Sequence, residues 1–283
     1  MRAESFELVT VASGAQSVRS REYGETFHPV VGPMAEARGL HVRQQRLVER
    51  ARATSGEFVI WDVGLGAGAN SVAVLEAFAG VDRGAKIALH SFDQSTAPLA
   101  FALAHAEELG YVAPFAEAFQ DLLETGSAAA GPVKWQLHPG DFRQSLHLPE
   151  IPAPHAILYD PYSPATNPEL WTLEHFAALF SRLDPARECL LTNYTRSTAA
   201  RVTLLLARFS VGLGHATGEK DQTTIASNSL PLLEEPLDCS WLQRVRRSTQ
   251  SAPFRNHPQP GPITAEDLAA LSAHPQFVRN IAC

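Results

Sequence analysis

A carboxylate and an aromatic ring, Asp160 and Tyr162, directly follow the apolar stretch 157–159, in a segment that also holds Pro161 and Pro164. The carboxyl end of a strand is where open α/β sheets bind ligands. Prolines fix φ and remove backbone donors, so this segment is expected to hold the carboxylate and the ring against a pocket. Such an arrangement suits binding of an amine or an amide. The alternative is that Asp160 only forms a turn before Pro161.

A glycine-rich run from Asp62 to Asn70 follows an expected strand and opens an expected helix. Its glycines, Gly64, Gly66 and Gly68, let a ligand approach the backbone closely. The run fits the acidic-x-Gly-x-Gly-x-Gly pattern of S-adenosylmethionine enzymes, but it also satisfies a loose dinucleotide fingerprint. The glycine run alone therefore leaves both kinds of cofactor open.

Two further acids follow expected strands. Asp93 is placed to accept both hydroxyls of a ribose, and its alternative role is that of an acid at a helix N-terminus. Asp141, followed by Phe142, suits an adenine amino group and ring face, although it also fits a turn cap. We find no hydride-transfer site, and the acid-Pro-aromatic segment at Asp160 resembles the motif that holds the nucleophilic nitrogen in many amino methyltransferases. The sequence therefore favours methyl transfer to nitrogen, with Asp160 receiving the proton of the amine.

A parallel sheet is needed to bring these residues to one edge, and the sequence predicts one. Between residues 58 and 228, strand and helix patterns alternate, as in a sheet covered by helices on both faces. The expected strands are 58–63, 87–92, 133–138, 156–159, 188–194, a short one past Val211, and 223–226. The expected helices are 70–78, 96–109, 115–123, 172–183 and 198–207.

The two ends of the chain differ from this central part, and we expect three regions. Residues 1–53 read as a hairpin, a loop and then one helix from Pro33 to about Ala53. Residues 54–228 form the Rossmann-like domain. Prolines interrupt residues 229–283, for which we expect a tail with one short helix at 264–272.

The composition of the 283 residues, with 45% hydrophobic and 19% charged side chains, is typical of a soluble globular protein. Apolar runs stay below the roughly 18–20 residues that a membrane helix needs, and residues 1–20 lack the features of a signal peptide. We therefore expect a cytoplasmic protein without a membrane span. The 11 histidines and 3 cysteines match no metal-ligand spacing, so no metal site is predicted.

The net charge of −7 argues against a protein that coats nucleic acid indiscriminately. A local basic patch is still compatible with it. Arg43, Arg46 and Arg50 have the spacing of one helical face, where they would contact RNA or simply face solvent.

Residues 20–228 resemble the MnmC-like methyltransferase domain, which completes 5-methylaminomethyl-2-thiouridine at the wobble position of bacterial tRNA, in its stand-alone form without an oxidase domain. Three parts of the sequence carry the resemblance: 23–26 with Glu36, then 64–70, then 160–171. The resemblance implies a class I methyltransferase fold, with a Rossmann-like, seven-stranded, mostly parallel sheet and a small N-terminal hairpin and helix extension. It also implies S-adenosyl-L-methionine as the methyl donor and 5-aminomethyl-2-thiouridine in tRNA as the acceptor.

The resemblance assigns roles to residues of this chain. Asp160 matches the catalytic acid. The expected cofactor-binding residues are Glu36, Asp62, Gly64, Gly66, Gly68, Asn70, Asp93 and Asp141. Tyr162, Arg43 and Arg46 are expected to bind the substrate, with the arginines on the anticodon stem-loop.

The chain also departs from the family pattern. The family has Asp-Gly-Phe-Ala-Pro where this chain has residues 160–164, and a lysine where Thr166 stands. A late Gly-Arg-Lys-Arg segment of the family is replaced by residues 218–221, which keep one lysine and gain two acids. Two alternatives therefore stay open, an N-methyltransferase acting on a small-molecule amine and a non-catalytic cofactor-binding scaffold of the same fold. The stand-alone form also leaves room for a separate oxidase as a partner.

Overall fold

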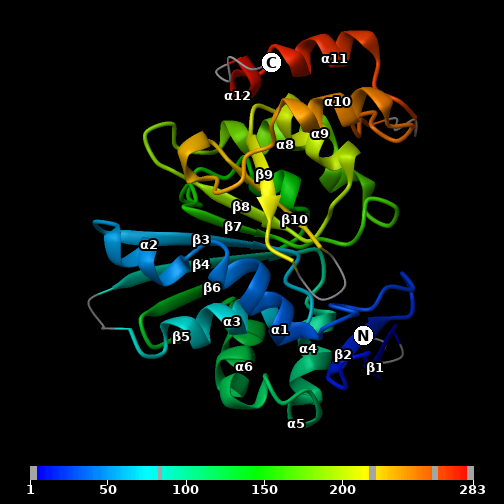
Figure 1. The fold of residues 1–283 in the computed structure, drawn as a ribbon. Helices are drawn as coiled ribbons and strands as arrows, with labels where there is room; N and C mark the ends of the chain where they lie inside the picture. The colour runs from blue at the N-terminus through cyan, green and yellow to red at the C-terminus, as the bar shows by residue number, and fades with distance from the viewer. Residues whose placement is uncertain (1–4, 82–84, 217–220, 257–260, 279–283) are drawn as a thin grey trace.

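The computed structural model describes residues 5–81, 85–216, 221–256 and 261–278, and its centre is a large mixed sheet (Figure 1). The strand order is β5-β6-β4-β3-β7-β8-β10-β9. The strands are β3 (Glu57–Val63), β4 (Lys86–Asp93), β5 (Ser127–Ala130), β6 (Val133–Pro139), β7 (Ala156–Tyr159), β8 (Leu190–Asn193), β9 (Ser210–Gly214) and β10 (Thr223–Ser227). The predicted α/β class and the mostly parallel sheet are confirmed.

The described residues form eight strands in this sheet, so the expected number of seven was wrong. The additional strand is β5, which pairs antiparallel with β6 at the edge. Its sequence, Ser-Ala-Ala-Ala, carries neither β-branched nor aromatic side chains, and alanine is depleted in strands. The pairing follows from the short connection at Gly131 and Pro132, which folds β5 back onto β6.

The five central strands are parallel, and they set the position of the site. β3 pairs with β4 on one side and with β7 on the other. The chain first runs outward from β3 to β4 and β6, then crosses back to β7 and β8. The crevice where the order reverses, beyond the carboxyl ends of β3 and β7, is where such sheets bind ligands.

Helices cover both faces of the sheet and bury a core on each (Figure 1). On one side lie α3 (Ala69–Phe78), α4 (Ala97–Ala104), α5 (Ala106–Leu109) and α6 (Ala116–Thr125). On the other side lie α7 (Phe142–Ser145), α8 (Leu173–Ser181), α9 (Thr198–Leu206), α10 (Cys239–Arg247), α11 (Ala265–Ser272) and α12 (Pro275–Val278). Within the described residues, none of these helices is long and apolar enough to cross a membrane.

The N-terminal extension begins with the predicted hairpin, β1 (Phe6–Thr10) and β2 (Gln16–Ser20). The single helix expected over 33–53 is instead broken into α1 (Pro33–Glu36), a π-helical segment 37–43 and α2 (Leu47–Ala53). Arg46 has a left-handed backbone with φ of 48°, which ends helical continuity.

Tertiary contacts account for this break and correct the predicted arginine face. The amide of Gln45 donates to the Thr192 hydroxyl and to a backbone carbonyl of β7, which fixes this segment against the sheet. Arg50 donates to the carbonyl oxygen of His155 at 2.6 Å and is half-buried, so it is a structural residue. Arg43 and Arg46 remain exposed.

The C-terminal region contains more helix than expected. The predicted helix at 264–272 is confirmed as α11, which Thr264 caps, while α10 and α12 were missed. Trp241 and Val245 of α10 are buried in the same hydrophobic core as residues of α9. The C-terminal region therefore packs on the sheet domain. Residues 218–220, part of the segment that departs from the family pattern, lie outside the described residues.

Candidate active site

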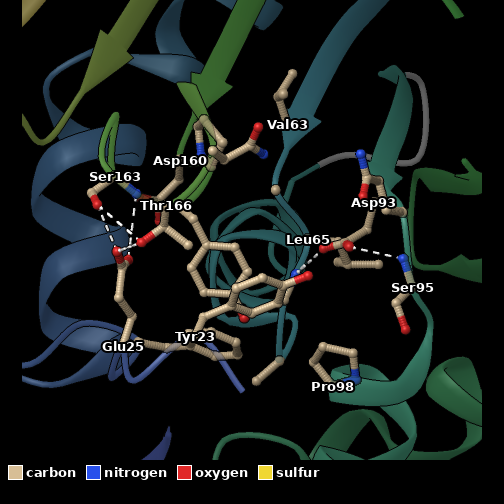
Figure 2. A pocket seen from close by; sticks show the side chains of 18 of the residues that line it. Tyr23, Glu25, Val63, Leu65, Asp93, Ser95, Pro98, Asp160, Ser163 and Thr166 are labelled. Atoms are coloured by element: carbon tan, nitrogen blue, oxygen red, sulfur yellow. Dashed lines mark hydrogen bonds between the residues drawn. The ribbon is translucent and has the colours of Figure 1, made fainter. Parts of the chain in front are cut away.

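A cavity of about 750 Å³ opens at the carboxyl ends of β3, β4 and β7 (Figure 2). Its walls come from the glycine loop after β3, from Asp93 at the end of β4 and from the segment after β7 that begins with Asp160. Residues 22, 23 and 25–29 of the N-terminal extension also line it. This volume lies in the range of pockets that enclose a small molecule or a cofactor.

Asp160 lines this cavity, as predicted, directly after β7. Its Oδ2 accepts a hydrogen bond from Nδ2 of Asn70 at 2.9 Å. The Nε2 atom of His28 lies 3.8 Å from the same oxygen. The carboxylate is therefore oriented by a residue that opens α3 and by a residue of the N-terminal extension.

The three glycines of the loop have different surroundings. Gly64 has φ of +90°, and a Cβ there would lie 2.5 Å from the carbonyl oxygen of Asp160. Gly66 lines the cavity with φ of +51°, opposite the ring of Phe27. Gly68 lies behind the cavity, because a Cβ there would collide with Phe119 in the core. Gly64 and Gly66 therefore shape the site, and Gly68 allows α3 to pack.

Asp93 lies in the cavity wall with both carboxylate oxygens held by the backbone (Figure 2). Oδ2 accepts from the N–H of Gly66 at 2.8 Å, and Oδ1 accepts from the N–H of Ser95 at 3.1 Å. Burial raises the pKa of Asp93, although these backbone donors oppose the shift. The prediction that Asp93 and the glycine loop share one ligand site is thus geometrically consistent.

Asp62 and Asn70 lie behind the cavity wall. Asp62 is fully buried in β3, and its Oδ2 accepts hydrogen bonds from the hydroxyls of Ser71 and Ser91. Burial raises the pKa of Asp62 to about 7, although the two hydroxyls lower it. Asp62 therefore links β3 to α3 and β4, and supports the glycine loop from the inside.

Asp141 is also placed outside the cavity lining. It caps α7 by accepting from the N–H of Arg143, and the guanidinium of Arg143 lies 2.6 Å from its Oδ2. Arg143 thereby lowers the pKa of Asp141. The neighbours Gly140, Phe142 and Arg143 line the cavity instead. This segment therefore contributes to the site through these three residues and not through the expected Asp141 carboxylate.

Glu36 lies in the cavity wall at the end of α1 and is buried, as its predicted place in the site requires. Nδ1 of His28 lies 3.7 Å from Oε2 of Glu36, so His28 stands between Glu36 and Asp160. Burial lowers the pKa of His28, but Glu36, Asp160 and Asp62 outweigh it and raise the pKa above its usual value.

The N-terminal loop is fastened to the Asp160 segment through Glu25, a contact that sequence reasoning missed. The Ser163 hydroxyl donates to Oε1 of Glu25 at 2.5 Å, and the Thr166 hydroxyl donates to the same oxygen (Figure 2). The ring of Tyr162 packs on Tyr23 with ring centroids 4.8 Å apart. The aromatic and turn-forming residues at 23–29 indicated a loop. No local pattern predicted that this loop would contact the segment after β7.

The remaining predicted substrate residues divide into two groups. Tyr162 lines the cavity between Tyr23 and Phe27. Arg43 and Arg46 lie on the surface, in the segment that continues from α1. Tyr194, which follows β8, also lines the cavity and donates to the carbonyl of Pro161 at 3.1 Å. Its position directly after β8 was the available signal in the sequence.

Comparison with known proteins identifies the family. Residues 114–229 match the model of an S-adenosyl-L-methionine-dependent methyltransferase family. The chain is 32% identical over 218 residues to the tRNA 5-methylaminomethyl-2-thiouridine biosynthesis bifunctional protein MnmC of Ectopseudomonas mendocina. Residues 114–229 therefore belong to the S-adenosyl-L-methionine-dependent methyltransferases, and the chain is similar to the methyltransferase MnmC proteins. The predicted resemblance is thereby confirmed.

The matches to the MnmC relatives cover most of this methyltransferase but only part of each relative. It is 29% identical over 219 residues to the MnmC protein of Aeromonas hydrophila, which matches 71% of the chain. The match to the Ectopseudomonas protein covers 69% of the chain and 32% of that relative. The methyltransferase thus spans about a third of the length of the curated relatives it matches.

A solved structure shows the same fold. The crystal structure of MnmC2 from Aquifex aeolicus superposes with a TM-score of 0.71 at 24% identity. The superposition covers 94% of this chain and 82% of that chain, so it extends beyond the sheet domain at both ends. Most of the N-terminal extension and most of residues 229–283 therefore fall within the shared architecture.

Proposed function

We propose that this methyltransferase transfers a methyl group from S-adenosyl-L-methionine to the amine of 5-aminomethyl-2-thiouridine at the wobble position of tRNA. The observation that carries the proposal is the placement of Asp160, which lines the cavity while its backbone packs against Gly64 of the glycine loop. The acceptor is proposed from the MnmC relatives, which are tRNA 5-methylaminomethyl-2-thiouridine biosynthesis proteins.

The residues of the cavity fit the cofactor. Gly64 and Gly66 have positive φ and bring backbone to the cavity surface, where a Cβ would press on the Asp160 backbone or the Phe27 ring. Asp93 presents a carboxylate that its backbone donors hold in place, which suits ribose hydroxyls. Gly64, Gly66 and Asp93 would hold the cofactor directly, whereas Asp62, Gly68 and Asn70 would support them from behind. Glu36 and the segment at Asp141 would complete the site.

Asp160 is the proposed proton acceptor. When bound, the cofactor supplies a methyl group on a sulfonium, which the lone pair of a neutral amine can attack. Asp160 would bind the ammonium form, take one proton from its nitrogen and leave the lone pair directed at the methyl group. Asn70 keeps the carboxylate in place during this exchange. Tyr162 would confine the acceptor from the side of the N-terminal loop.

We assign the regions of the chain accordingly. Residues 54–228 would form the catalytic domain, residues 1–53 would close one side of the site, and residues 229–283 would brace the sheet. Arg43 and Arg46 are exposed and would contact phosphates of the anticodon stem-loop. A tRNA substrate would place the protein in the cytoplasm, and a separate oxidase would supply its aminomethyl group.

A small-molecule amine is the second candidate acceptor. The net charge of −7 and the presence of Thr166 where the family has a lysine both favour an acceptor without phosphates. The chemistry at Asp160 would be unchanged.

The test uses purified protein, labelled S-adenosylmethionine and tRNA that carries 5-aminomethyl-2-thiouridine, followed by a panel of alkyl amines. Label in the anticodon uridine supports the proposal. Label in small amines alone would favour the second candidate. Cofactor binding without any transfer would instead indicate a non-catalytic scaffold.

A further inference from the structure

His28 is held between two carboxylates in the cavity wall. Its Nδ1 lies 3.7 Å from Glu36 and its Nε2 lies 3.8 Å from Asp160. The imidazole is 11% exposed, so water does little to screen these interactions. The residue also has a left-handed backbone with φ of 48°, which is uncommon for a side chain other than glycine and is often found at functional sites.

The charge state of the ring decides whether both contacts are favourable. A neutral imidazole carries one N–H donor, whereas an imidazolium carries two. Each ring nitrogen of His28 lies within ion-pair distance of a different carboxylate. Only the imidazolium presents an N–H group to both carboxylates. A neutral ring would leave one nitrogen lone pair directed at a carboxylate oxygen.

The other ionisable groups around His28 support the cation. Asp62 of β3 adds a third carboxylate at longer range, and the three acids raise the pKa of His28 despite its burial. His41, which follows in the π-helical segment, is the neighbouring base, and burial lowers its pKa to about 3, so it is neutral. Tyr194 also interacts with Asp160 and Glu36, and burial raises its pKa well above 10, so it is neutral too.

We propose that His28 is a positioning residue for methyl transfer: its imidazolium joins Glu36 to Asp160, keeps the Asp160 carboxylate ionised and holds it in the cavity wall. The inference rests on the proposed role of Asp160 as proton acceptor. A protonated Asp160 could not take a proton from the ammonium group of the acceptor. His28 therefore allows the site to work at lower pH than it would without this imidazolium.

The main test compares wild-type protein with His28→Asn in single-turnover methyl transfer from pH 5 to pH 9. Asparagine tolerates the left-handed backbone at this position and carries no charge. A cation within 4–6 Å of a carboxylate shifts its titration by roughly 1–3 pH units. The acid limb of kcat/KM should therefore move upward by about 1–3 pH units in His28→Asn. His147→Asn, at an exposed histidine outside the cavity, should leave the limb in place.

An acid limb that stays at the wild-type pH in His28→Asn would overturn the proposal, because a merely structural role would lower the rate equally at every pH. A second measurement does not depend on activity. The imidazole signals of His28, followed by NMR against pH, should titrate above the ordinary value of 6.5 in wild type and lower in Glu36→Gln. Titration at or below 6.5 in wild type would also overturn the proposal. Absence of transfer in wild type with this titration intact would instead count against the proposed reaction.

Discussion

A Cβ atom on Gly64 would lie 2.5 Å from the carbonyl oxygen of Asp160, so the glycine loop touches the backbone of the proposed catalytic residue. Gly64→Ala should therefore displace both segments. Its left-handed backbone alone costs an alanine roughly 1–2 kcal/mol of folding free energy. We expect a larger loss, together with strongly weakened binding of S-adenosylhomocysteine, measured by denaturant unfolding and by calorimetry.

Gly14→Ala is the matched control for that change. Gly14 has nearly the same φ, +85°, with open space where a Cβ would stand. Its substitution should cost the backbone penalty alone and leave ligand binding intact. Equal losses in the two variants would show that the contact between Gly64 and Asp160 has no role.

Asp160→Asn should reduce methyl transfer by about 10²- to 10⁴-fold, the usual contribution of a positioned proton acceptor. An asparagine oxygen can still accept the hydrogen bond from Asn70, so the fold and the cofactor affinity should change little. Single-turnover rates and calorimetric binding of S-adenosylhomocysteine measure the two effects separately. Transfer within tenfold of wild type would remove Asp160 from the mechanism.

Glu25→Gln should loosen the N-terminal loop. One carboxylate oxygen of Glu25 accepts from both Ser163 and Thr166, and the other accepts from the Ser163 N–H at 3.4 Å. A glutamine would place an amide donor against one of these donors. Hydrogen exchange should become faster at residues 22–29, and KM for the acceptor should rise about tenfold, as expected for losing a charged hydrogen bond worth about 1.5 kcal/mol. Glu117→Gln, at an exposed position of α6, should change neither quantity.

The stability of the protein should depend on Asp62 in a defined pH window. Its pKa is raised by burial to about 7, so the folded state binds a proton that the unfolded state releases near pH 4. This contribution to stability is full below pH 4 and is lost as the pH rises to 7. Asp62→Asn removes the titration. The Tm of the variant minus the Tm of wild type should therefore increase from pH 4 to pH 7. Each kcal/mol corresponds to about 2–4 °C. A Tm difference that stays constant with pH would contradict the raised pKa.

Much of the sheet could be predicted because its strands have strong local signals. Residues 58–61 of β3 and residues 156–159 of β7 are continuous apolar runs, as expected for strands buried on both faces. β5 was missed because three alanines carry no such signal. The break at Arg46 was missed because it depends on contacts of Gln45 with β7 and β8, which are more than 100 residues away.

The predicted site was right where position along a strand decides position in space. Gly64 and Asp160 directly follow strands and Asp93 ends one, and all three meet at one cavity. Side-chain direction was harder to predict. Asp62 belongs to the same run as the loop glycines, yet it faces the interior, and Asp141 is held by Arg143. Contacts between distant segments, above all that of Glu25 with Ser163, could not be predicted from the local sequence pattern.

The hydrogen bonds of Glu25 have a consequence for how the protein is made. Glu25 and Ser163 are separated by 138 positions, so the N-terminal loop cannot dock until the exit from β7 has left the ribosome. Synthesis proceeds at about 5–20 residues per second, which means a wait of roughly 7–30 s for the first segment of the nascent chain. During that interval the aromatic residues Tyr23 and Phe27 lack their partner Tyr162, so this loop exposes apolar rings while the rest of the domain is being made.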